Sequence, residues 1–374
     1  MASYSQGLNV TLIVRLFIYT ILLSSYSLYA SESLRFIGDV NFATGEKFQN
    51  TEIGGLSGIA YDALTKKILA VSDDKSLVNE TRFYEFDLSL TEKAFSIKPS
   101  KVVKLKTQDG TYFKKGVADF EGIAFYGKDV LISNEGAINR AKPTPPELYR
   151  FTREGEFIEL LPIPEKFLLP KKDQTDKLYG SRDNKSFESL STSLDGKTTF
   201  MASEESLFQD GSISTISYSS RVRIIIYKDL KPVSEVAYEL EKVEALKAVD
   251  LSSGENGLVD IAAIDDKNFY TLERSWLPFI NKNVIRIFKC KITNKTTDVS
   301  KMDNLKGATF TTVEKELVAD LDVYLTKMNP ASLDNIEGIA LGPVLENGKR
   351  SLIVVSDNNF GKGQRTLFIA FEIN

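Results

Sequence analysis

Carboxylates stand at the start of short apolar stretches in several parts of this chain. "DNIEGIALGP" places Glu337 directly before Gly-Ile-Ala, and "ADFEGIAFYG" does the same around Glu121. Weaker copies of the pattern occur at Ser57 in "GGLSGIAYD", at Glu188 in "KSFESLSTS" and at Asp260 in "GLVDIAAID". The intervals between these positions grow from 64 residues (57 to 121) to 77 residues (260 to 337), a spacing typical of propeller blades or solenoid units.

The residue types available limit the chemistry that such acids could perform. The sequence has no histidine and a single cysteine, Cys290. These counts exclude a Ser-His-Asp triad, a histidine general base and His-ligated zinc or haem. Carboxylates without His or Cys favour Ca²⁺ or Mg²⁺, and an irregular ring of oxygen donors suits Ca²⁺ better than the octahedron of Mg²⁺. The alternative is that each acid only caps a strand or turn through backbone N–H groups.

The elements that must position the acids are predicted to be strands. The second repeat divides into "FEGIAFY", "DVLISNE", "ELYRFTR" and "EFIELLPI", and the third divides in the same way. The fifth repeat ends after three strands, and "SLRFIGDVNF" near the N-terminus supplies a fourth. We therefore predict an all-β fold, a β-propeller of four-stranded blades. Five blades are favoured over six, in a ring that the N-terminal strand closes.

A second set of acids is expected at the same mouth of the channel. The first strand of each blade lines the channel, and the antiparallel second strand returns to the mouth where the first began. The second predicted strands end in the following residues: Asp73, Glu135, Glu204, the pair Glu273–Arg274, and Asp357. A shared cation would relieve the repulsion among carboxylates crowded in this way.

The N-terminal segment differs from the rest of the chain. Arg15 is followed by the apolar run "LFIYTILLSSYSLYA", which ends at Ala30 before a polar stretch. We predict a secretory signal in residues 1–30 and one propeller domain in residues 31–374; an uncleaved anchor is the alternative. Nothing downstream is apolar enough to span a membrane, so we expect an exported protein, periplasmic or secreted. The net charge of −4 indicates no surface for nucleic acid.

The ordered segments also resemble a known family. They are "GGLSGIAYD…AVSDD", "ADFEGIAFYG…LISNEG", "SRDNKSFESLS…MASEE", "FYTLERSW" and "DNIEGIALGP…LIVVSDNNFGKGQRTLFIAFE". In this order they resemble the phytase-like esterase family, described as "esterase-like activity of phytase". The resemblance implies a propeller whose acids carry phosphoester hydrolysis. The positions that match the family's acids are Glu121, Glu188, Glu204, Glu273, Asp334, Glu337 and Asp357.

Two functions follow as hypotheses. The first is an exported, calcium-dependent phosphoric ester hydrolase, a monomer that acts on a small anionic phosphoester. Its expected metal ligands are Glu121, Glu188, Asp260, Glu337, Glu273, Asp357 and Ser57. Its expected catalytic residues are Glu204 or Glu135, acting on water, with Arg274 and Arg182 stabilising phosphoryl charge. The second is a non-catalytic binding propeller of the cell envelope that calcium stabilises. A Ser–Lys carboxylic esterase is a third class, but no GxSxG elbow occurs.

Overall fold

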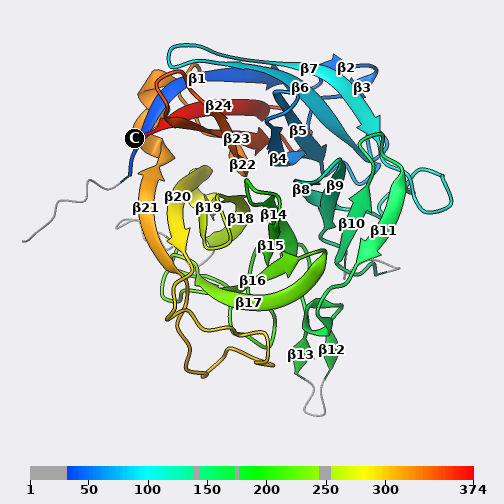
Figure 1. The fold of residues 1–374 in the computed structure, drawn as a ribbon, viewed down its shortest axis with the longest axis vertical. Coiled ribbons are helices and arrows are strands. Elements are labelled where there is room, and N and C mark those ends of the chain that lie inside the picture. Colours follow the sequence, from blue (N-terminus) through cyan, green and yellow to red (C-terminus); the bar gives the residue numbers. More distant parts are fainter. Residues whose placement is uncertain (1–31, 138–142, 173–176, 244–253) are drawn as a thin grey trace, which may run out of the picture. The chain divides into compact units, whose positions relative to one another are not determined.

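The protein is a ring of five β-sheets (Figure 1). The computed structural model describes residues 32–137, 143–172, 177–243 and 254–374, and the predicted signal segment lies outside them. Within Ser33–Asn374, each of the five large sheets has four antiparallel strands. The described residues therefore confirm the five-bladed propeller and not the six-bladed alternative.

Four consecutive strands make each of the first four blades. Blade 1 contains β4 (Leu56–Asp62), β5 (Lys67–Ser72), β6 (Arg82–Leu90) and β7 (Phe95–Lys104). Blade 2 contains β8 (Phe120–Tyr126), β9 (Asp129–Asn134), β10 (Glu147–Phe151) and β11 (Phe157–Leu161). Blade 3 contains β14 (Phe187–Thr192), β15 (Thr198–Ser203), β16 (Arg221–Lys228) and β17 (Lys231–Glu239). Blade 4 contains β18 (Glu255–Ala263), β19 (Asn268–Leu277), β20 (Lys282–Lys291) and β21 (Glu314–Asp320).

Blade 5 combines the two ends of the described chain. It contains β22 (Asn335–Val344), β23 (Arg350–Asp357), β24 (Arg365–Ile373) and the N-terminal strand β1 (Leu34–Ala43). β1 pairs antiparallel with β24, from Leu34 opposite Ile373 to Ala43 opposite Arg365. An ion pair of 2.6 Å between Arg35 and Glu372 crosses this seam. The predicted closure is confirmed, and it removes the open sheet edges that would otherwise face solvent.

Short elements decorate the connections between the blades. Two small hairpins pair β2 (Lys47–Phe48) with β3 (Thr51–Glu52) and β12 (Lys171–Lys172) with β13 (Leu178–Tyr179). Three 3₁₀ turns cover Glu165–Phe167, Pro278–Ile280 and Leu321–Lys327.

Apolar side chains fill the spaces between neighbouring blades. Between blades 5 and 1, Phe86 packs against Phe368 and Phe42, with ring centroids 5.2 and 5.9 Å apart. Between blades 1 and 2, Phe120 belongs to a buried cluster that includes Phe83. Such aromatic contacts fix the blades against one another, so residues from different blades keep a defined spacing at the channel.

The innermost strand of every blade faces the central axis. These strands contact one another in the order β4, β8, β14, β18, β22 and back to β4. Each shows a register shift against the second strand of its blade, close to its own start. Such a bulge inserts a residue without a partner and can aim its side chain away from the sheet. The five bulges therefore surround one mouth of the channel.

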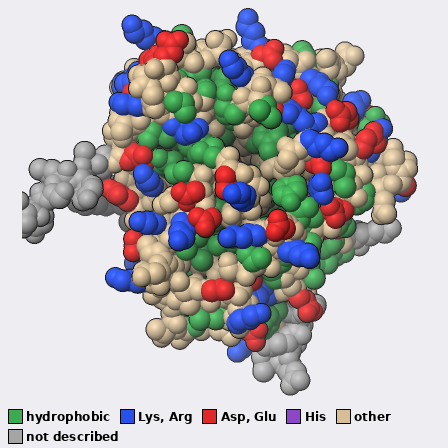
Figure 2. Space-filling model, in the orientation of Figure 1, with side chains coloured by type: hydrophobic (Ala, Val, Ile, Leu, Met, Phe, Trp, Pro, Cys, Tyr) green, Lys and Arg blue, Asp and Glu red, His purple; other side chains and the backbone are tan. Residues whose placement is uncertain are grey.

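The surface carries both signs of charge. Figure 2 shows one face of the ring, where hydrophobic side chains gather around the middle and Lys, Arg, Asp and Glu side chains are interspersed. Neither sign forms a continuous field on this face, in keeping with the small net charge. In the described part of the chain, no helix has the length and apolar character needed to cross a membrane.

Candidate functional site

The bulges form an inner ring of five positions around the channel mouth. The residues within the register shifts are Ser57, Glu121 with Gly122, Glu188, Val259 and Glu337. Blades 2, 3 and 5 thus contribute carboxylates, blade 1 a hydroxyl and blade 4 an apolar side chain. We expected Asp260 to occupy this position in blade 4. Val259, one residue earlier, occupies it instead.

Asp260 lies deeper among the inner strands. Its carboxylate accepts backbone N–H groups of Leu190 at 3.4 Å and of Ile261 and Ile339 at 2.8 Å. It therefore joins the inner strands of blades 3, 4 and 5. Burial raises the pKa of Asp260, and the three amide donors partly offset that effect.

A second ring consists of residues that lie in the second strands or directly after them, opposite the start of the inner strands. The backbone N–H groups of Asp73, Glu135 and Glu204 donate to the carbonyl that precedes the inner strand of the same blade, at 2.7–2.8 Å. Strand pairing gives Arg274 and Asp357 the same position in blades 4 and 5. This ring therefore holds four acids and one arginine.

Glu273, the acid predicted for blade 4, lies one residue before that ring and does not line the cavity. Its carboxylate accepts the Tyr238 hydroxyl of blade 3 at 2.5 Å, and the Asn256 amide and Lys315 Nζ of blade 4 at 2.7 and 2.8 Å. It therefore joins blade 4 to blade 3.

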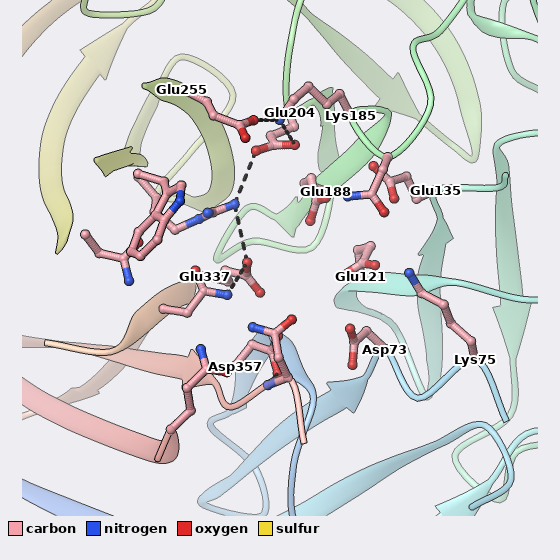
Figure 3. Close-up of a pocket in the computed structure, with 17 residues that line it drawn as sticks. Asp73, Lys75, Glu121, Glu135, Lys185, Glu188, Glu204, Glu255, Glu337 and Asp357 are labelled. Atoms are coloured by element: carbon pink, nitrogen blue, oxygen red, sulfur yellow. Dashed lines mark hydrogen bonds and ion pairs between the residues drawn. The ribbon is translucent and has the colours of Figure 1, made fainter. Parts of the chain in front are cut away.

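The two rings enclose a cavity of about 350 Å³. Figure 3 shows the labelled carboxylates converging on it from all five blades. Its charged lining residues are Asp73, Lys75, Glu121, Glu135, Lys185, Glu188, Glu204, Glu255, Arg274, Glu337 and Asp357. Trp276 and the amides of Asn184, Asn283, Asn335, Asn359 and Gln364 complete the wall. Eight carboxylates against three cations make the cavity strongly electronegative.

Several of these carboxylates have little or no compensation. Glu121 is 6% exposed, and its carboxylate has no hydrogen bond or ion pair with any described residue. Glu188, which is half-buried and which the adjacent blade presents to the same cavity, also has no hydrogen bond or ion pair with any described residue. Glu135, 3% exposed, accepts a single hydrogen bond from the described residues, from the Ser186 N–H at 2.9 Å. Buried charges without partners are costly, so these groups require either protons or a cation.

The basic residues compensate one side of the cavity. Arg274 lies 3.3 Å from Glu204 and 3.5 Å from Glu337, bridging blades 3 and 5. Lys185 pairs with Glu204 at 3.4 Å and with Glu255 at 2.5 Å. Among the described basic residues that line the cavity, only Lys75 reaches the opposite side, where it pairs with Asp119 at 2.7 Å. The carboxylates that lack a basic partner therefore lie on the side of the cavity that blades 2 and 3 form.

The pKa values of the acids reflect this crowding. Burial and the charge of Glu188 raise the pKa of Glu121 well above its usual range. Burial, with Asp119 and Glu204 nearby, raises the pKa of Glu135 to about 8. Burial also raises the pKa of Glu337 to about 8, although Arg274 opposes the shift. Burial raises the pKa of Asp357 to about 6. At neutral pH the cavity therefore retains protons that a bound cation would displace.

The donor set fits a hard cation. Two groups of carboxylates have ligand oxygens within 4.8 Å of one another. One consists of Asp119, Glu121 and Glu135, and the other of Glu135, Glu188 and Glu204. All these ligands are oxygens, as Ca²⁺ and Mg²⁺ require.

Three other predicted residues lie outside the cavity lining. Arg182 donates to the carbonyls of Ser206 and Gly211 at 2.8 and 2.6 Å and stacks over Phe208. Ser57 is buried, and its hydroxyl has no partner among the described residues. Asp334 accepts the backbone N–H of Arg365 at 3.1 Å.

The sequence analysis missed two residues near the carboxylates. Lys75 follows the acids at the end of β5, and Asp119 stands two residues before Glu121 in "ADFEG". Both residues stand close in sequence to acids of the repeated motif, and this proximity could have identified them.

Comparisons with known proteins place the chain in a family. An endo-arabinase from Bacteroides thetaiotaomicron has a TM-score of 0.40 at 12% identity, covering 87% of this chain and 97% of that one. A glycosyl hydrolase from Bacteroides ovatus has a TM-score of 0.39 at 12% identity, covering 92% and 91%. An uncharacterized secreted protein of Arthroderma benhamiae is 25% identical over 141 residues, which are 32% of this chain and only 27% of that relative. The family model "Phytase-like: Esterase-like activity of phytase" matches residues 51–360.

Proposed function

The chain belongs to the phytase-like family, and from that premise we propose an exported phosphoric ester hydrolase with a calcium-type metal pocket. The observation that carries the proposal is the pair of uncompensated carboxylates, Glu121 and Glu188, in a cavity that also presents Arg274. A bound divalent cation would stabilise charge on a phosphoryl group and lower the pKa of a coordinated water. Ca²⁺ suits the irregular donor set better than Mg²⁺.

One side of the cavity would bind the cation and the other side the phosphoryl group. Glu121, Glu135 and Glu188 would hold the cation on the side of blades 2 and 3. Arg274 has a buried Nε that finds no partner in the described part of the chain, so its guanidinium retains donor capacity for phosphoryl oxygens. Arg182 donates its hydrogen bonds to backbone carbonyls, so we do not propose that it binds phosphoryl oxygens.

Glu204 is the carboxylate best placed to orient or deprotonate water. It belongs to the second carboxylate group and also lies 3.3 Å from Arg274, between the metal side and the anion side. A base at that junction can reach a water beside the phosphoryl group that Arg274 would hold.

Hydrolysis of generic substrates tests the proposal. Purified protein would be assayed on p-nitrophenyl phosphate and bis(p-nitrophenyl) phosphate in chelator, Ca²⁺ or Mg²⁺. We expect turnover that requires the cation. Arg274→Gln should lower kcat/KM by roughly 100-fold, the usual effect of losing a donor to transition-state charge. Arg182→Gln, the matched control, should retain activity.

The opposite result would favour a different function. If neither substrate is hydrolysed with any of these cations, while calcium still raises the melting temperature, the protein is a non-catalytic binding propeller that calcium stabilises.

We also propose that residues 1–30 direct export of the protein and are then cleaved off. The apolar run that ends at Ala30 supports this, as does the secreted relative. Mass spectrometry of the protein recovered from outside the cytoplasm would show an N-terminus at Ser31. An intact Met1 would contradict cleavage.

A further inference from the structure

The two groups of carboxylates in the cavity share one residue. Glu135 is the only member common to the group with Asp119 and Glu121 and the group with Glu188 and Glu204. The first group comes from blade 2 and the additional members of the second come from blade 3. Glu135 therefore lies at the boundary between two potential ligand sets.

The protein backbone fixes Glu135 in this bridging position. Its own N–H donates to the Asp119 carbonyl of blade 2 at 2.8 Å. Its Oε1 accepts the N–H of Ser186, the residue before the inner strand of blade 3, at 2.9 Å. One end of the residue is thus tied to each blade, and its carboxylate oxygens retain lone pairs for further ligands.

In each group a carboxylate remains that has no basic partner among the described residues. The two groups together contain five carboxylates; Lys75 pairs with Asp119, and Lys185 and Arg274 both pair with Glu204. Glu121 in the first group and Glu188 in the second have no basic partner in the described part of the chain, so each group calls for a cation of its own. Glu121, almost fully buried and without a partner among the described residues, faces this space and requires a ligand of its own.

From these observations we propose that the cavity binds two divalent cations, one in each carboxylate group, with Glu135 bridging them. The inference rests on the proposed function and specifies its metal centre. Paired metal sites that act on phosphoesters hold their ions about 3.5–4 Å apart, a separation that a single carboxylate can span. Arg274, outside both groups, then remains available to the anionic substrate.

Manganese binding tests this centre independently of activity. Mn²⁺ prefers the same oxygen ligands and gives an electron paramagnetic resonance signal. Equilibrium dialysis of the metal-free protein should give two Mn²⁺ ions per chain. At full loading the six-line spectrum should be broadened by coupling between neighbouring ions. Glu135→Gln should abolish the coupling and weaken binding of at least one ion by 10-fold or more.

Two further variants separate the sites from a general loss of charge. Glu121→Gln should weaken one ion and Glu188→Gln the other, each leaving one ion bound with an uncoupled spectrum. Glu255→Gln removes a carboxylate from the rim of the same cavity, outside both groups. That control should still bind two coupled ions.

The outcomes distinguish the centre from the function. One ion per chain, or two ions without coupling, would overturn the bridged centre, and cation-dependent hydrolysis with one ion would leave the proposed function standing. Protein that binds no ion would overturn both.

Discussion

Glu135→Gln should have opposite effects on stability with and without calcium. The substitution keeps the shape of the side chain and an acceptor for the Ser186 N–H, but it removes the ionisable group. Burial raises the pKa of Glu135 from 4.5 to about 8. The folded carboxyl therefore holds its proton where the unfolded one has lost it. The stability of metal-free wild type should fall as the pH rises from about 4.5 towards 8.

The size of this effect follows from the pKa difference. One pKa unit corresponds to about 1.4 kcal/mol, so the wild type should lose roughly 3 kcal/mol between pH 5 and pH 7 through this group. The unfolding entropy of a propeller of about 340 residues is about 0.7 kcal/mol/K. In chelator at pH 7 the variant should therefore melt about 4 °C above wild type, and the gap should shrink towards pH 5.

Calcium should reverse the order. Each bound ion stabilises the folded state by about 4 kcal/mol when free calcium exceeds the dissociation constant 1,000-fold. A variant that loses one ion forfeits more than it gained in chelator, so it should melt below wild type. Circular dichroism melts in EGTA and in CaCl₂ at several pH values would measure both differences.

A matched control and a contrary result complete this test. Glu154→Gln changes an exposed acid in the β10–β11 turn and should follow wild type in every condition. If the Glu135→Gln and wild-type curves shift together in both conditions, the carboxylate does not bind metal and serves only the blade architecture.

Three other perturbations test the fold and its contacts. Asp74→Asn should cost about 3–5 kcal/mol in urea unfolding, because the Asp74–Arg82 ion pair of 2.6 Å has both side chains 0% exposed; a loss below about 1 kcal/mol would contradict this. Deleting residues 31–42 removes most of β1 and should abolish cooperative melting, unless the seam contributes little. Gly122→Ala would place a Cβ 2.7 Å from the Glu188 carbonyl oxygen and should lower stability by about 1–3 kcal/mol, with unchanged melting as the contrary result.

The blades could be predicted because their signals are local. The four strands of blade 2 and the acid at the start of its inner strand all lie in one continuous stretch of sequence. Closure was predictable for a similar reason, since three strands near the C-terminus left a place for the strand that begins at Leu34. Period-two patterning and turn residues carry this information without reference to distant residues.

The register of blade 4 was predicted wrongly because Asp260 was aligned with the acids of the other blades. The apolar residues on either side of the bulge should have set the alignment. In "LVDIA" the leucine and isoleucine correspond to the phenylalanine and isoleucine of "FEGIA", which places Val259 at the bulge and Asp260 at the glycine position. The same alignment places Arg274, and not Glu273, in the second ring. A shift of one residue reverses the direction of a strand side chain, so this error moved two predicted ligands out of the cavity.

Contacts between blades determine what the acids can do, and those contacts are not local. Nothing in "ISNEG" indicates that Glu135 accepts an N–H from Ser186, fifty-one residues later. Nor does the sequence around Arg274 indicate that it replaces an acid in the ring and neutralises carboxylates of blades 3 and 5. Arg274 therefore compensates one side of the cavity, whereas Glu121 and Glu188 have no partner among the described residues. Under the proposed function, this break in the five-fold repeat would separate a metal side from an anion side, which a ring of five identical acids could not provide.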